Sequence, residues 1–419
     1  MAIKMSRQRR GWAIVGAFFV AAAFIQGSGF DTVGVFIAPL VKHFGWSRAQ
    51  VSTLPSMIAI FIGVSAPLIG WLLDRFEARW IAAAGSLLAA AAFVIAATAN
   101  SYTAMLSAYC ALGVGMAAGA VLPCYFVVSN WFSDRRGLAL SVSQVGIELG
   151  GTVMALLTAY FIQAHGWRFA YFALALPIVF LVTPPLALLV RNRPPEEGSS
   201  DAAANAIPQA QSVPGLDVGE ALASRSFWLI AIFNFCAVSV GTGIVVHLVP
   251  YLMGLGFSAT HAATVFSAML AFQLPGKPVL GWMADRIGIR LTMTIDAALI
   301  ALGCALLLGA GHALPLWLFV ALYGFTFGAP VPLIPMLLAD AVGLKRFGSL
   351  MGLLSLPAVI GSASGPIVAG AIFDRTGSYV WSIELFTVML LSVAVLPLLC
   401  VPFSAGATEP IARPAAAVS

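Results

Sequence analysis

The chain carries one loop pattern, Gly-Trp-x-x-Asp-Arg-x-x-x-Arg, twice. The two copies are Gly70-Trp-Leu-Leu-Asp74-Arg75-Phe-Glu-Ala-Arg79 and Gly281-Trp-Met-Ala-Asp285-Arg286-Ile-Gly-Ile-Arg290. The copies are 211 residues apart (285 minus 74). The same shift brings Gly45-Trp46-Ser47 onto Gly256-Phe257-Ser258 without a gap. A single offset held over so long a stretch indicates a duplicated structural unit.

The composition requires that most side chains face lipid. Of 419 residues, 61% are hydrophobic and 9% are charged, and the mean hydropathy is +0.98. A soluble domain carries about 25% charged residues, and a membrane span needs roughly 20 apolar residues. We predict twelve spans, at residues 12–38, 49–73, 80–99, 103–130, 137–163, 168–190, 226–253, 260–283, 291–310, 313–340, 348–373 and 379–402.

The duplication divides these spans into two groups of six. We therefore predict an all-α membrane protein with twelve transmembrane helices in two pseudo-symmetric six-helix bundles. The predicted parts are an N-terminal bundle at 1–190, a linker rich in Pro, Ala, Ser and Gly at 191–225, a C-terminal bundle at 226–404 and a tail at 405–419.

The basic residues predict the orientation. Most Lys and Arg residues fall in the loops on the side of the N-terminus, and Lys42, Arg48, Arg168 and Arg375 fall on the other side. The positive-inside rule places both termini and the linker in the cytoplasm, and we expect a monomer in the plasma membrane. The net charge of +5 follows from this bias rather than from nucleic-acid binding.

Enzyme chemistry finds no support in the sequence. The five cysteines fall within predicted spans and lack metal-binding spacing, and no H-E-x-x-H or P-loop sequence is present. We expect no cofactor, no bound metal and no catalytic residue.

The repeated loops predict a gate. Their glycines allow helices to approach closely, so Asp74 and Asp285 can face a neighbouring helix N-terminus and arginines such as Arg135 or Arg346. Contacts made in one conformation and broken in the other bias alternating access. The alternative is that these charges only set topology. The predicted gating residues are Asp74, Arg75, Arg79, Arg135, Asp285, Arg286 and Arg290.

Ionisable residues at membrane depth cost about 2.5–3.5 kcal/mol each on insertion scales, so each is a functional candidate. Asp296 and Glu384 lie within two turns of a span end, and we expect both to reach interfacial water. The full set is Asp31, Glu148, His247, Lys277, Asp296 and Glu384.

Lys277 stands apart because no other Lys or Arg lies in the core of a predicted span. Its repeat partner is Ala66, so the duplicated scaffold does not require a charge at this position. Gln273 lies one turn earlier on the same helix face. Lys277 is predicted to bind an anionic group of the substrate. The alternative is a structural ion pair with Asp31 or Glu148.

The chain resembles the major facilitator superfamily. The resemblance covers nearly the whole chain and rests on the two loop copies, on Trp131-Phe-Ser-Asp-Arg135-Arg136-Gly137 and on Gly166-Trp167-Arg168. The first loop has Glu77 where the family usually has glycine. The resemblance implies two six-helix halves that rock about a substrate near the bilayer midplane.

Within this superfamily, Gln273-Leu-Pro-Gly276-Lys277-Pro-Val-Leu-Gly281 is similar to the eighth span of monocarboxylate and oxalate:formate transporters. There, a cation at the Lys277 position engages the carboxylate. Span 1, from Gly29 to Phe36, and His247-Leu-Val-Pro250-Tyr251 look like the same branch. The chain departs from that branch at Gln273, where the animal carriers have an acid, and at Asp31, where they have a lysine. Residues 355–372 contain no second cation, which favours a monoanion.

The predicted function is proton-coupled transport of a small monocarboxylate, with the bilayer and protons as the other partners. Asp31, preferred, or Glu148 would carry the proton, because a carboxylate in a low-dielectric site is driven toward its neutral form. An anion exchanger or an efflux carrier remains an alternative, since Gly137, Gly146 and Gly150 have exporter spacing although Gly151 replaces the usual proline. The predicted substrate-binding residues are Lys277, Gln273, Tyr125, Asn234, His247, Tyr251 and Tyr323.

Overall fold

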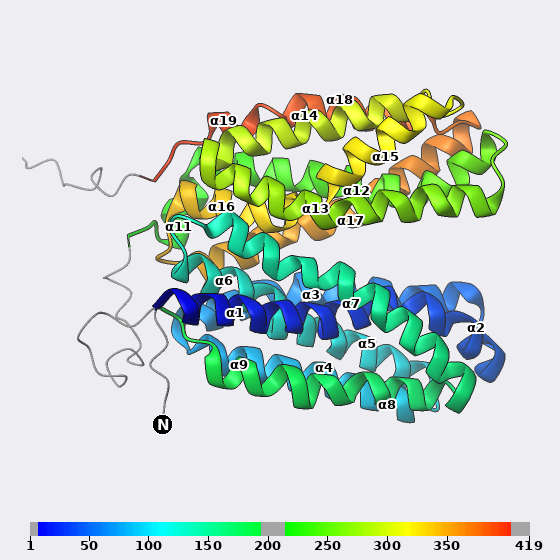
Figure 1. Cartoon of the computed structure of the whole chain (residues 1–419), viewed down its shortest axis with the longest axis horizontal. Coiled ribbons are helices and arrows are strands. Elements are labelled where there is room, and N and C mark those ends of the chain that lie inside the picture. The colour runs from blue at the N-terminus through cyan, green and yellow to red at the C-terminus, as the bar shows by residue number, and fades with distance from the viewer. Residues whose placement is uncertain (1–6, 194–213, 404–419) are drawn as a thin grey trace, which may run out of the picture.

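The computed structural model describes residues 7–193 and 214–403, which form two helical bundles side by side (Figure 1). The N-terminal bundle contains α1 (Arg7–Ala21), η1 (Ala22–Asp31), α2 (Val33–Phe44), α3 (Arg48–Arg75), α4 (Ala78–Thr98), α5 (Tyr102–Met116), η2 (Ala117–Val121), α6 (Leu122–Trp131), α7 (Arg136–His165), α8 (Trp167–Pro177), η3 (Ile178–Val182) and α9 (Thr183–Leu189). The C-terminal bundle contains α11 (Val218–Ala223), α12 (Arg225–Gly254), α13 (Ala259–Ile287), α14 (Ile289–Leu307), α15 (Ala313–Phe327), α16 (Pro330–Val342), α17 (Phe347–Thr376), α18 (Val380–Val393) and α19 (Leu396–Leu399).

These helices match the predicted spans closely. In the described residues, ten helical stretches are long and apolar enough to cross a membrane, and α15 with α16 forms an eleventh that is bent by 43°. The twelfth is α13, which is long enough but carries Gln273, Lys277 and two prolines. The first candidate span covers Gln8–Gly29, which is shorter than the predicted 12–38. The helix α2 that follows ends at Phe44, where Gly45, with a φ of 70°, closes it.

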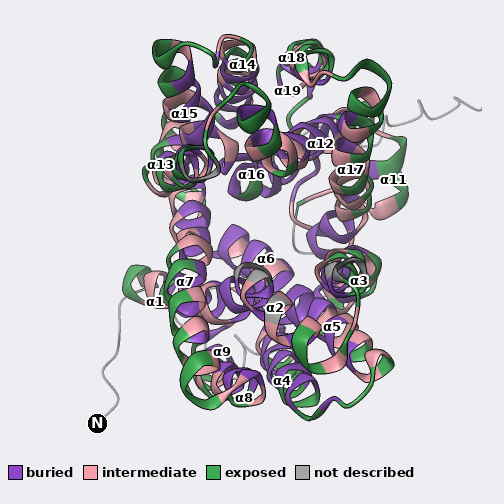
Figure 2. Cartoon of the chain, turned by 90° about the vertical axis from the view of Figure 1, so that its right-hand side faces the viewer, coloured by how far each residue is buried: buried purple, intermediate pink, exposed green. Residues whose placement is uncertain are grey.

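Exposed apolar side chains cover the outside of the bundles. Leu156, Phe180 and Leu188 are each about two-thirds exposed or more, an arrangement that suits lipid rather than water. Figure 2 views the end opposite to the linker and shows exposed residues on the outer rims, with buried residues where helices face one another.

Two helix pairs make the most extensive contacts between the halves: α3 with α17, and α7 with α13. Glycines bring each pair close together. A methyl group on Gly70 would lie 2.0 Å from the carbonyl oxygen of Gly348, and one on Gly137 would lie 2.3 Å from that of Gly281. The 211-residue shift relates Gly70 to Gly281 and Gly137 to Gly348, so both seams are built from the same repeated positions.

Both glycine contacts lie on the linker side, by which we mean the end of the molecule where α11 and the loop before α17 are found. From there α7 slopes away from the C-terminal half toward the opposite end (Figure 1). The closest approaches between the halves are therefore concentrated on the linker side.

The end of the linker is fastened to the loop before α17. Backbone hydrogen bonds run from Leu344 N to Pro214 O (3.1 Å) and from Leu216 N to Val342 O (2.8 Å). The Asp217 carboxylate accepts a hydrogen bond from Lys345 at 2.7 Å. This linker latch (residues 214–217 with 342–346) fixes the position from which α17 begins.

Asp217→Asn should weaken the linker latch by less than about 1 kcal/mol, since Asp217 is half exposed. Hydrogen bonding from Lys345, with the charge of Lys345 and the neighbouring Arg346, lowers the pKa of Asp217 below its usual value. Its contribution is therefore complete above about pH 4 and is lost only as the pH falls through the lowered pKa.

The measurement is the melting temperature of purified protein from pH 8 to pH 3. Asp217→Asn should melt slightly below the wild type at neutral pH and converge with it in acid. Exposed Asp374 supplies the control variant Asp374→Asn, which should show no such convergence. A difference that grows in acid would contradict this account.

Candidate substrate site and inter-half contacts

An ion pair joins the two halves at the centre of the long helices. The Lys277 ammonium on α13 donates to Oε1 of Glu148 on α7. The lysine side chain is 3% exposed and the glutamate side chain 18%. Of the two partners left open by the sequence, Glu148 is therefore the one in contact. The side chain of Asp31 lies outside the described part of the structure, so its role stays a prediction.

The walls around Lys277 come from the C-terminal half. Gln273 is buried one turn before it on α13. Gly328, at the bend between α15 and α16, lies against both side chains: a Cβ there would be 2.6 Å from Gln273 Oε1 and 2.6 Å from Lys277 Cε. A larger residue at position 328 would displace the ends of both side chains. Gly328 is not among the predicted site residues, although a glycine just before Ala329-Pro330 indicates a break in the helix.

Glu148 uses only one of its two oxygens in this pair. Its Oε2 atom is buried and has no hydrogen-bond partner among the described residues. An acceptor left unpaired in a dry site is unfavourable for the ionised form.

The polar residues that precede Glu148 on α7 pack against neighbouring helices. Gln144 donates to Cys124 Sγ at 3.6 Å, and Ser141 is fully buried. A Cβ on Gly281 would lie 2.2 Å from Ser141 Oγ. This face of α7 is therefore packed against α6 and α13 in the present conformation.

The other predicted substrate contacts bond to the backbone of their own half. Asn234 donates to Leu354 O at 3.1 Å, and Tyr251 donates to Leu307 O at 3.0 Å. His247 lies between the Tyr379 hydroxyl (3.2 Å) and Pro366 O (3.0 Å). Their role as substrate donors is untested and stays a prediction.

Two predicted tyrosines lie deep in the bundles. Tyr125 is buried in α6, and Tyr323 is fully buried in α15. The Tyr323 hydroxyl has no hydrogen-bond partner among the described residues. Of the predicted substrate-binding set, Lys277 and Gln273 lie together with Glu148 opposite. His247 and Tyr251 form a second pair, in which both contact the ring of Tyr379.

The expectation that Asp296 reaches interfacial water is wrong. Asp296 is 0% exposed, and neither carboxyl oxygen has a hydrogen-bond partner in the described residues. It lies two turns inside α14, where neighbouring helices cover it. Glu384, on α18, is exposed.

Asp74 and Asp285 bridge the halves on the linker side. Asp74 Oδ1 accepts from Gly348 N (3.0 Å), and Oδ2 accepts from Ser349 N (2.9 Å) and Ser349 Oγ (2.5 Å). Gly348 and Ser349 lie in the first turn of α17, in the other half. A carboxylate at a helix N-terminus satisfies free N–H groups and the helix dipole.

Asp285 repeats this contact in the opposite direction. Its two oxygens accept from Gly137 N at 2.8 Å and Leu138 N at 2.9 Å, at the start of α7. The sequence predicted the helix N-termini and nearby arginines as partners. The hydrogen bonds come from the N-termini, and Arg135 and Arg346 contribute through charge.

The remaining loop arginines make contacts within one half. Arg75 lies 4.2 Å above the ring of Trp71, and Arg286 lies 5.4 Å above that of Trp282, all four exposed on the outer surface. This arrangement suits cation–π contact at a membrane interface.

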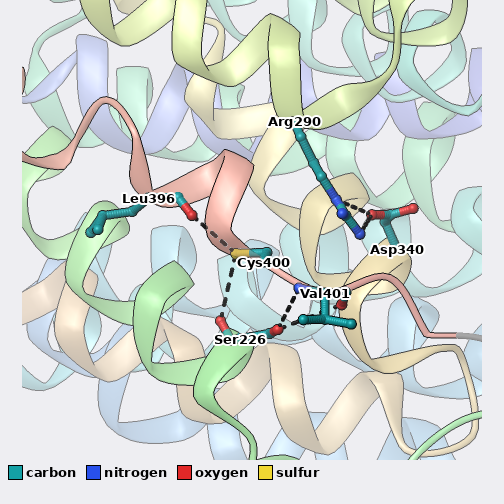
Figure 3. A network of polar contacts seen from close by, with 6 residues as sticks. All are labelled: Ser226, Arg290, Asp340, Leu396, Cys400 and Val401. Carbon is teal, nitrogen blue, oxygen red and sulfur yellow. Dashed lines mark hydrogen bonds and ion pairs between the residues drawn. The ribbon is translucent and has the colours of Figure 1, made fainter.

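Arg79 and Arg290 pair with acids. Arg79 lies 3.9 Å from Glu77. Arg290 donates through Nε and Nη2 to Asp340 Oδ2 (Figure 3). Beside it, Val401 N donates to Ser226 Oγ at 2.9 Å and fastens the C-terminal segment to α12.

Comparison with known proteins agrees with this geometry. The model of the Major Facilitator Superfamily matches residues 19–268 and 248–416. The chain belongs to the Major Facilitator Superfamily.

Relatives within this superfamily align over most of the chain. The MFS transporter asaE of Aspergillus flavus is 27% identical over 387 residues, which cover 90% of this chain and 83% of the relative. Monocarboxylate transporter 13 of Rattus norvegicus is 26% identical, covering 91% of this chain and 87% of the relative. Human monocarboxylate transporter 12 is 25% identical, covering 88% and 76%.

Solved structures support the same fold. The human organic anion transporter MFSD10 superposes with a TM-score of 0.69 at 16% identity and covers 94% of this chain and 100% of its own. An outward-conformation structure of FucP gives a TM-score of 0.68 at 14% identity, covering 93% and 99%. This member of the superfamily therefore has two six-helix bundles, as predicted.

Gly281→Ala should keep the halves apart on the linker side. The added Cβ would lie 2.2 Å from Ser141 Oγ and 2.5 Å from Gly137 O, and such overpacking costs about 1–3 kcal/mol. Spin-label distances across the linker side should lengthen, measured after replacement of the native cysteines. Gly16→Ala is the matched control, since a Cβ there meets nothing within 4 Å. Unchanged distances in Gly281→Ala would contradict this, because the seam would then accommodate the added methyl group without separating.

Proposed function

We propose that this protein transports a small organic monocarboxylate by alternating access, coupled to protons, with Lys277 as the substrate-binding cation. The observation that carries this proposal is the buried Lys277–Glu148 pair between the halves. Monocarboxylate transporters among the relatives support the substrate class.

The pair itself supports a carboxylate ligand. Glu148 presents a carboxylate to Lys277, so a substrate carboxylate can take the same hydrogen bond in the same desolvated place. A charge-assisted hydrogen bond of this kind is worth more there than in water. One cation balances one negative charge, which favours a monoanion over a dianion.

Proton coupling follows from displacing Glu148. When a substrate carboxylate occupies Lys277, Glu148 loses its counter-charge while it stays buried with an unpaired oxygen. A buried unpaired carboxylate is costly, so Glu148 takes up a proton. Substrate and proton binding then strengthen each other. The sequence preferred Asp31 for this role, and the contact with Lys277 favours Glu148.

The two aspartates supply the gate. In the cytoplasm-facing orientation of the linker, which the positive-inside rule favours, Asp74 and Asp285 hold the cytoplasmic side closed. Opening that side must break both helix-terminus contacts. The balance between them and the contacts of the alternative state sets the conformational equilibrium.

The test is uptake of labelled pyruvate and lactate into liposomes under an imposed pH gradient. Lys277→Ala should weaken binding by about 10- to 100-fold, as expected for a hydrogen bond between charged groups. Lys277→Arg should keep part of it, since the charge survives in a different geometry. Unchanged pyruvate and lactate affinity in Lys277→Ala would rule out Lys277 as the binding cation.

Glu148→Gln separates coupling from binding. The variant should bind pyruvate and exchange it but lose accumulation driven by the pH gradient. Glu384→Gln, an exposed acid on α18, is the control and should accumulate normally. Gradient-driven accumulation in Glu148→Gln would transfer the proton role to Asp31, tested as Asp31→Asn. Exchange without response to pH in the wild type would favour the anion exchanger.

Asp74→Asn should change turnover much more than equilibrium binding, because Asp74 contacts α17 and not the Lys277 site. An amide cannot accept hydrogen bonds at both positions as the carboxylate does. Pyruvate uptake rates and affinities in Asp74→Asn, with Asp374→Asn as control, provide the measurement. A collapse of affinity with unchanged spin-label distances would contradict a gating role.

A further inference from the structure

Asp296 is a buried acid that the proposed mechanism does not use. It is 0% exposed on α14, and both carboxyl oxygens lack a hydrogen-bond partner in the described part of the chain. An ionised carboxylate in such surroundings is strongly disfavoured.

Among the described residues of the helices that pack against α14, no charged side chain pairs with Asp296. The helices packed against α14 are α13, α15, α16, α18 and α19. On α13, Lys277 pairs with Glu148, Asp285 binds the start of α7, Arg286 lies over Trp282 and His261 is exposed. The titratable groups on the other helices are Tyr323 on α15, Asp340 on α16, which pairs with Arg290, and exposed Glu384 on α18. On α14 itself, the other titratable groups are Arg290 and buried Cys304.

The repeat shows that the acid is an addition to the scaffold. Asp296 corresponds to Gly85 (296 minus 211), and Pro330 corresponds to Gly119 (330 minus 211). In the N-terminal half these two glycines touch: a Cβ on Gly85 would lie 2.3 Å from Gly119 N. The equivalent register places Asp296 against the start of α16 at Pro330.

The tenth span is also different at this level. Its N-terminal counterpart, Tyr102–Trp131, is a single span. The C-terminal copy breaks between Phe327 and Pro330 with a 43° bend. The acid and the break thus occur together, and in the half that carries Lys277.

The break is in contact with the proposed substrate site. Gly328 lies within it and packs against Gln273 and Lys277. The bend of the tenth span is therefore bounded by Asp296 on one side and by the Lys277 site on the other.

We propose that Asp296 is a second proton-binding site, which holds a proton in this conformation and couples the bend of the tenth span to the Lys277 site. Loss of that proton requires water or a counter-charge at Asp296, so α14 must separate from α16. This movement shifts Gly328 and the packing around Lys277. The coupling to Lys277 rests on the proposed function, whereas the protonation of Asp296 does not.

Infrared spectroscopy of the protein in lipid nanodiscs tests the protonation without any substrate. The carbonyl stretch of a protonated carboxylic acid should be present in the wild type and retained in Glu384→Gln, but one component should be lost in Asp296→Asn. Asp296→Gly, which copies Gly85, should lose the same component. A spectrum unchanged by both Asp296 substitutions would overturn the proposal.

Hydrogen exchange tests the coupling to the bend. Amides of residues 326–334 should lose protection in the wild type as the pH rises, after correction for intrinsic exchange. Asp296→Asn, which stays neutral, should keep its protection. The same pH dependence in both proteins would overturn the coupling.

Pyruvate binding measured at several pH values links the two sites. The slope of log Kd against pH should be smaller in Asp296→Asn than in the wild type by up to about one, as for one linked proton. Equal slopes would overturn the link to Lys277. A wild type that does not bind pyruvate would contradict the proposed function, and infrared spectroscopy and hydrogen exchange would then decide on Asp296.

Discussion

An ammonium group buried at the level of the bilayer core needs a negative partner, and this requirement organises the centre of the molecule. Lys277 cannot reach water in the present conformation, and Glu148 of the other half supplies its counter-charge. The two residues meet because the glycines at 137 and 281 bring α7 and α13 into backbone contact. In the proposed mechanism the pair has a structural role and a functional role at once, since any anion that replaces Glu148 also removes a bond between the halves.

The two interfaces between the halves differ in the polarity of their central residues. The repeat partner of Glu148 is Val359, which packs against Gly63, and that of Lys277 is Ala66, which packs against Gly352. The seam between α3 and α17 is thus apolar at the level where the seam between α7 and α13 is ionic. The carboxylate contacts on the linker side, by contrast, are duplicated. The scaffold and the Asp74 and Asp285 contacts are thus present in both halves, whereas the ion pair at the centre is present in one seam alone among the described residues.

Most of the fold could be predicted from the sequence because the deciding features are local or repeated. Span lengths follow from apolar runs, and the docking of Asp74 and Asp285 follows from a motif whose glycines and acid lie within five residues. The partner of Lys277 could not be predicted in this way. Glu148 is 129 residues away, and its choice over Asp31 depends on how two helices pack rather than on the pattern of either one.

Asp296 shows where distance along the chain is a poor guide to exposure. It lies two turns from the start of α14, which in an isolated helix would place it near interfacial water. In the folded chain that end of α14 is held by the pair of Arg290 with Asp340, and Phe403 N donates to Asp340 O at 2.8 Å. The C-terminal segment and α16 therefore cover the end that the sequence left open. How deeply a residue near a helix end is buried therefore depends on which other segments pack over that end. Those segments are far away in the sequence, so the sequence pattern around the residue does not reveal its burial.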